Sequence, residues 1–117
     1  YLAELARAAA DLGGNLLVLG SPMQRKIPAG HTLADATEFA LDTLGHCLPA
    51  LTDTGVTLCL EPLTPLETEF WTSAAEAVAT IRKLDHPRVK LHLDVKAMSA
   101  ESQSIPEVIR ANAADTF

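Results

Sequence analysis

The stretch VTLCLE at residues 56–61 decides how the chain is expected to fold, because a short apolar run ends directly in a carboxylate. The same pattern returns as VKLHLD at residues 89–94. Apolar runs of this length, bounded by turn residues, favour buried strands over helices. We therefore predict two strands, each with an acidic residue at its carboxyl end.

Outward from these two runs, helical patterns alternate with strand patterns. Ser73-x-x-Glu76 predicts a capped helix between the runs, and Ser104-x-x-Glu107 predicts another after the second. Before the first run, NLLVLG (15–20) predicts one more strand. A helix from Leu2 to Leu12 is expected before this strand, and a long apolar helix over 33–51, bent or broken near Pro49, is expected after it.

This alternation predicts an α/β domain of right-handed βαβ units with a parallel sheet, occupying residues 1–117. Two architectures fit, a small open sheet or part of a (β/α)8 TIM barrel, whose usual length is about 250 residues. Both ends of the chain look cut, which favours the barrel piece. In either architecture, ligands bind at the carboxyl ends of the strands.

Composition excludes several classes of protein. A net charge of -6 without a basic run disfavours nucleic acid as a partner, and no uninterrupted apolar segment is long enough to cross a membrane. The two cysteines, Cys47 and Cys59, lack metal-type or redox-type spacing and indicate reduced thiols. We expect a cytoplasmic protein with one core.

Glu61 and Asp94 are the first candidate site residues, because both follow strands at the same edge of the sheet. Neighbouring parallel strands lie about 4.8 Å apart, so the carboxylates are expected within roughly 5 Å, sharing a divalent cation or polarising a substrate oxygen. Alternatively, either residue meets solvent or caps the next helix. His92 shares the face of Asp94 and is expected to orient it or reach the metal, unless it is simply packed in the sheet.

Loop residues provide further candidates. Arg25, in GSPMQRK (20–26), is suited to a two-pronged contact with a carboxylate or phosphate, although a loop arginine is by default solvated. Phe70 and Trp71 offer an aromatic wall for a sugar, or alternatively a hydrophobic staple under the following helix.

Three segments together resemble the sugar isomerase and epimerase superfamily of xylose isomerase-like TIM barrels. They are LVLGSPMQR (17–25), LCLEPLTPLETEFWTSAAEA (58–77) and VKLHLDVKAM (89–98). The resemblance covers essentially the whole chain, from the helix before the third strand of the barrel to the helix after the fifth.

The resemblance implies a divalent metal, Mn²⁺, Mg²⁺ or Co²⁺ with Zn²⁺ possible, held by a Glu, an Asp, a His and a second Glu. Glu61 matches the first Glu and Asp94 the Asp, while the other two ligands belong to strands outside this chain. In the epimerases of the family the two metal-bound glutamates exchange a proton next to a carbonyl, through an enediolate, so Glu61 is also implied as catalytic. Glu67 matches a glutamate that contacts sugar hydroxyls.

One departure concerns the substrate. Ketose 3-epimerases of the family typically have Asp-x-x-His-Met, whereas Ala97 stands here in place of the His. The neighbouring Lys96, with Arg25, is expected to favour a substrate with a carboxylate or phosphate, the alternative being a solvated lysine. Rival functions are aldose-ketose isomerisation, a noncatalytic sugar- or acid-binding barrel, and a metal-dependent endonuclease of the same superfamily acting at abasic (AP) sites, which the net charge disfavours.

The chain by itself is expected to lack activity. The open sheet would expose the side chains that face a barrel interior, such as Leu17, Cys59 and Leu91 or their neighbours at alternate positions. A homo-oligomer formed through the unpaired edges is therefore a further expectation.

Overall fold

The computed structural model describes residues 1–117 and contains three parallel strands among six α-helices. In chain order the elements are α1 (Leu2–Asp11), β1 (Leu16–Leu19), the 3-10 turn η1 (Met23–Arg25), α2 (Leu33–Gly45), α3 (Leu48–Thr54), β2 (Thr57–Leu60), α4 (Ala74–Leu84), β3 (Val89–Leu91), α5 (Val95–Met98) and α6 (Ile105–Asn112). The predicted α/β class and parallel pairing are confirmed.

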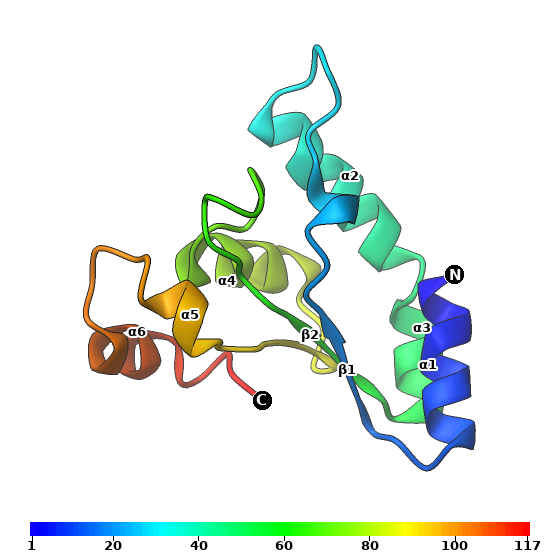
Figure 1. Ribbon diagram of the computed structural model, residues 1–117. Coiled ribbons are helices and arrows are strands. Elements are labelled where there is room, and N and C mark those ends of the chain that lie inside the picture. Colours follow the sequence, from blue (N-terminus) through cyan, green and yellow to red (C-terminus); the bar gives the residue numbers. More distant parts are fainter.

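The strands lie in the order β1-β2-β3, so each strand pairs with its neighbour in the sequence. Val18 pairs with Cys59, and Cys59 pairs in turn with Lys90. Because paired residues in a parallel sheet point to the same side, these three define one face. In Figure 1, α1 and α3 lie at one end of the sheet, and α4, α5 and α6 lie at the other.

The helices cover the opposite face. Leu58, Leu60, Val89 and Leu91 belong to one hydrophobic core with residues from the helices, and Leu17 packs against it. Consecutive right-handed crossovers place every helix on the same side of a sheet, as in a barrel wall. Leu17 and Leu91 therefore face the helices, whereas Cys59 lies on the other face with Val18 and Lys90, so the alternative of neighbours at alternate positions holds for β1 and β3.

The long helix predicted over 33–51 is interrupted at His46 and Cys47, which separate α2 from α3. Pro49 lies in the first turn of α3, where its missing N–H has no helical partner to lose. The predicted break is thus confirmed and falls just before the proline. Thr32 and Asp35 form a capping box at the start of α2.

The strand predicted over 89–94 is shorter than expected, because β3 ends at Leu91 and not at Asp94. Asp94 instead caps the single-turn helix α5. Thr116 forms a parallel bridge with Leu91 on the free edge of β3. None of the helices combines the length and the apolar character that crossing a membrane requires.

Candidate active site

Glu61 follows β2, the central strand, and its carboxylate lies at the carboxyl-end edge of the sheet, here called the rim. Its backbone N–H still donates to the Leu19 carbonyl, so the register continues past the strand end. The side chain is 19% exposed, and Oε1 lies 3.4 Å from Nε2 of His92. No lysine or arginine forms an ion pair with this carboxylate, which leaves it available to a ligand.

His92 lies against Glu61, a contact that the sequence pattern did not predict. The reason is the sheet geometry: residues two apart on one strand are more than 6 Å apart, while register neighbours on adjacent parallel strands are about 4.8 Å apart. Leu60 pairs with Leu91, so the next residues along, Glu61 and His92, are neighbours. The imidazole thus has a contact with Glu61, while its expected role toward Asp94 or a metal stays a prediction.

Asp94 accepts a hydrogen bond on Oδ1 from the backbone N–H of Ala97, at 2.9 Å. This is the capping role that the sequence analysis kept as an alternative. A cap uses one oxygen of the carboxylate, so Oδ2 is left for a second partner. The predicted approach of Asp94 to Glu61 stays a prediction.

The residues at the rim fit part of a divalent cation site. Two carboxylates and an imidazole, from Glu61, Asp94 and His92, are donors that Mn²⁺, Mg²⁺ and Co²⁺ accept. No three side chains of His, Cys, Asp or Glu lie close enough together to hold an ion by themselves. Glu61, His92 and Asp94 are therefore not gathered around one point in this chain, and a shared cation site stays a prediction.

Glu67 and Lys96 lie on two different segments of the rim, the loop after β2 and helix α5. Lys96 Nζ donates to Glu67 Oε1 at 2.5 Å, and Glu67 Oε2 accepts from the N–H and hydroxyl of Thr64. These bonds, the one from Lys96 first, lower the pKa of Glu67 to about 2. The same pair raises the pKa of Lys96. Both groups are charged at neutral pH, and together they offer a donor beside an acceptor.

Arg25 is buried, which the sequence did not indicate. The residue is only 5% exposed; Nη2 donates to the Leu19 carbonyl, and Cζ lies 5.1 Å from the centroid of the Trp71 ring. Its Nε and Nη1 have no hydrogen-bond partner. Burial lowers the pKa of Arg25 to about 10, against a smaller raising effect of the Glu61 charge.

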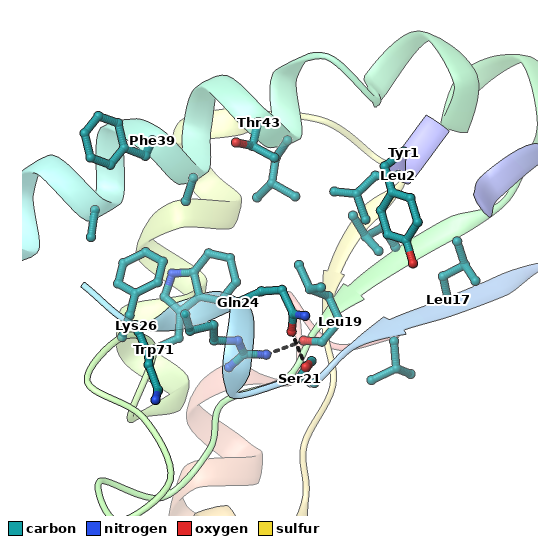
Figure 2. Close-up of a pocket in the computed structure, with 18 of the residues that line it drawn as sticks. Tyr1, Leu2, Leu17, Leu19, Ser21, Gln24, Lys26, Phe39, Thr43 and Trp71 are labelled. Carbon is teal, nitrogen blue, oxygen red and sulfur yellow. Dashed lines mark hydrogen bonds between the residues drawn. The ribbon is translucent and has the colours of Figure 1, made fainter. Parts of the chain in front are cut away.

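A cavity of about 620 Å³ lies between α1, β1, the loop after β1 and α2. Figure 2 shows its wall, with Trp71, Gln24 and Ser21 near the rim and Phe39 and Thr43 on α2. Arg25 is also part of the lining, although its Nε and Nη1 are themselves buried. The aromatic wall and the arginine that the sequence analysis named separately are thus brought together.

Trp71 itself is mostly a core residue. It is 3% exposed, stacks on Phe70 at 4.6 Å and donates from Nε1 to Thr80 Oγ1 of α4 at 3.0 Å. This packing against the next helix agrees with the alternative of a hydrophobic staple. Trp71 also lines the cavity, and its contact with a substrate stays a prediction.

Gly20 is the site residue that sequence reasoning missed. It ends β1 opposite Glu61, and a Cβ built on it would lie 1.8 Å from Glu61 Oε2. The available signal was a glycine directly after the first strand, at the same edge of the sheet as the carboxylate after the next strand. A single sequence could not show that the Glu61 carboxylate occupies the space beside Gly20, because this contact depends on the register between β1 and β2.

Comparison with known proteins gives the family. The profile described as xylose isomerase-like TIM barrel matches residues 1–116. The chain belongs to this family. No protein with a curated description matches the sequence.

Solved structures of the xylose isomerase-like fold superpose closely on the chain. The 3-keto-D-glucoside 4-epimerase of E. coli has a TM-score of 0.84 at 20% identity over 98% of this chain and 46% of its own. D-Psicose 3-epimerase of Clostridium cellulolyticum H10 has a TM-score of 0.83 at 24% identity, over 97% of this chain and 40% of its own. AP endonuclease, family 2, of Brucella melitensis has a TM-score of 0.81 at 20% identity, over 97% of this chain and 44% of its own. The chain spans less than half of each, and the likeness shows a shared TIM barrel fold.

Proposed function

We propose that this chain is the central part of a metal-dependent sugar isomerase or epimerase, with Glu61 as the residue that moves the proton next to the substrate carbonyl. The observation that supports this best is the Glu61 carboxylate at the end of the central strand, without a cationic partner and within reach of His92. In a TIM barrel, catalytic groups stand at this rim. We call the longer polypeptide that contains the remaining strands the complete barrel protein.

Glu61 and Asp94 are the residues that would hold the divalent cation, Mn²⁺, Mg²⁺, Co²⁺ or Zn²⁺. When bound, such a cation stabilises the negative charge that develops on the substrate oxygen during proton removal. Glu61 provides the base, and a carboxylate half-buried at 19% exposure is shielded from competing water.

Glu67, Lys96, Arg25 and Trp71 are proposed to contact the substrate. The Glu67–Lys96 pair, an acceptor beside a donor, is suited to sugar hydroxyls. The buried guanidinium of Arg25 places a positive charge in the cavity wall, and this charge favours a substrate that brings an acidic group. We therefore propose a sugar acid or a sugar phosphate ahead of a neutral sugar.

The free thiols agree with the proposed cytoplasmic location. Cys47 and Cys59 are both buried and unpaired. Burial raises the pKa of Cys59 to about 11, so this thiol stays protonated and unreactive at neutral pH.

The proposed chemistry is tested in the complete barrel protein by incubation with ketoses and their acid and phosphate analogues in deuterated water. Proton exchange next to the carbonyl puts deuterium into the substrate, which mass spectrometry detects. We expect Glu61→Gln to abolish this uptake, while Glu38→Gln, on the exposed side of α2, leaves it unchanged. Sugar binding without any deuterium uptake would establish the noncatalytic alternative.

The substrate class has its own test. Lys96→Ala in the complete barrel protein is expected to reduce the preference for acidic over neutral substrates, measured as a ratio of kcat/KM values. An unchanged ratio, together with equal turnover of neutral and acidic sugars by the parent protein, would remove the acidic substrate from the proposal. Cleavage of DNA at abasic sites instead would favour the endonuclease, whose fold the chain also shares.

A further inference from the structure

The Glu61 carboxylate lies between two neighbours that come from the strands on either side of it. Toward β1 it meets Gly20, where a Cβ would come within 1.8 Å of Oε2 and 3.0 Å of Cδ. Toward β3 it meets His92, whose Nε2 is 3.4 Å from Oε1. The two oxygens are therefore placed by different strands.

The Glu61 carboxylate fills the space where a side chain at position 20 would stand. The backbone conformation at Gly20 does not itself require a glycine. The positive φ angles of the chain occur at Gly13, Gly30 and Gly55 and at two non-glycine residues, but not at Gly20. An alanine would thus fit the backbone of β1. What it would displace is the free end of the Glu61 side chain, which can rotate away at little cost to the fold.

His92 is suited to hold the other oxygen because it is its neighbour in register and keeps its ring at the rim. The backbone N–H of His92 donates to the Leu60 carbonyl at 2.9 Å, which fixes its position beside the residue before Glu61. Its side chain is 41% exposed, so the ring belongs to the open site and not to the core.

We infer that Gly20 and His92 are positioning residues for Glu61: the glycine leaves room for Oε2 over the end of β1, and the imidazole holds Oε1 from β3. This inference rests on the proposed role of Glu61 as the group that acts on the substrate. A carboxylate held from both sides loses less freedom when it binds a ligand or takes up a proton.

The first test needs no metal and no substrate. The complete barrel protein is labelled with ¹⁵N-histidine and treated with a chelator, and the His92 ring signals are identified by their loss in His92→Gln. We expect Glu61→Gln and Gly20→Ala each to change the tautomer balance of the His92 ring. Gly45→Ala is the matched control, because Gly45 has no atom within 4 Å of an added Cβ. Unchanged His92 signals in both variants would overturn the inference.

The second test measures Mn²⁺ affinity in the same variants by electron paramagnetic resonance. Partners of a ligand typically change metal affinity 10- to 100-fold when removed, so Gly20→Ala and His92→Leu are expected to weaken binding about tenfold or more. His92→Gln, which keeps a side-chain N–H, should restore most of the affinity, and the melting temperatures should stay close to that of the parent.

The two tests separate the inference from the proposed function. If the parent protein binds no Mn²⁺ and Glu61→Gln changes nothing, the metal site is wrong, while the histidine spectra still decide whether Gly20 and His92 position Glu61. If Mn²⁺ binds through Glu61 but Gly20→Ala and His92→Leu bind it as well as the parent does, the positioning role is refuted and the metal site remains.

Discussion

Trp71 shows how a single side chain joins the rim to the core. It adopts a φ of 56°, a left-handed conformation that is uncommon for a residue other than glycine, and is 3% exposed. Its Nε1 donates to Thr80, a threonine that is itself 2% exposed. The indole is thus held by the packing and by one buried hydrogen bond, which also fixes the wall of the cavity beside Arg25.

Removing that hydrogen bond is expected to lower stability. Thr80→Val keeps the shape of the side chain but leaves the buried indole N–H without an acceptor, which costs about 1 to 3 kcal/mol. Denaturant unfolding of the complete barrel protein measures this loss. Thr37→Val in α2 is the control, because the Thr37 hydroxyl bonds only to the Leu33 carbonyl of its own helix. Equal effects of the two substitutions would contradict the role given to the indole bond.

Glu67 predicts a dependence of stability on pH. Its pKa is lowered to about 2 from an ordinary value of 4.5, so its bonds to Lys96 and Thr64 stabilise the fold above about pH 4.5 and lose that effect as the pH falls toward 2. Glu67→Gln should flatten the stability curve between these limits, as followed by thermal melting. Glu38→Gln should leave the curve as it is; a parallel loss in both variants would show that Glu67 is not responsible.

At the scale of elements, Asp94 has two roles: it caps a helix, and it is proposed as a metal ligand. It caps α5, which carries Lys96 and the buried Ala97 and Met98. Asparagine caps helices about as well as aspartate but lacks the negative charge. The two roles can therefore be separated by substitution.

We expect Asp94→Asn to leave the melting temperature of the complete barrel protein nearly unchanged while weakening Mn²⁺ binding. Asp94→Ala should also lower the free energy of unfolding, by about 1 kcal/mol, because the Ala97 N–H loses its acceptor. Calorimetric melting and metal titration measure the two effects. Full metal affinity in Asp94→Asn would remove Asp94 from the ligand set and leave it as a cap alone.

At the scale of the whole molecule, helices cover one face of the sheet, and the other face is exposed at β1 but closed over Cys59, which is 1% exposed. Val18, on the face away from the core, is 42% exposed, and β1 has a free edge. Apolar side chains and unpaired strand edges of this kind favour association. The chain spans 46% of the E. coli epimerase and 40% of the Clostridium one, where the remaining strands can complete a barrel.

The 117-residue chain, produced alone, is therefore expected to aggregate or to form dimers through its edges, with no isomerase or epimerase activity. Size-exclusion chromatography with light scattering measures its state, and the deuterium-uptake assay measures its activity. The complete barrel protein is the comparison. A monodisperse monomer of the short chain that turns over any sugar in a metal-dependent way would show that it is a self-sufficient enzyme.

The sequence by itself determined the order of the strands and the longer helices, the parallel sheet and the family. Each apolar run and each capping pattern, such as Ser104 with Glu107, depends on residues close together in the chain, so local physics was enough. The carboxylates Glu61 and Asp94 could be named for the same reason, since each follows its own strand directly or within a few residues.

Only the tertiary structure decided which side chains meet. The contact of Glu61 with His92, the room left by Gly20, the ion pair of Glu67 with Lys96 and the burial of Arg25 against Trp71 all join residues distant in the chain. Strand register and loop packing set these contacts, and both arise from the fit of the whole core. A shift of one residue in β3 would turn His92 toward the core and Leu91 away from it, so the burial of Leu91 in the core is what keeps His92 beside Glu61.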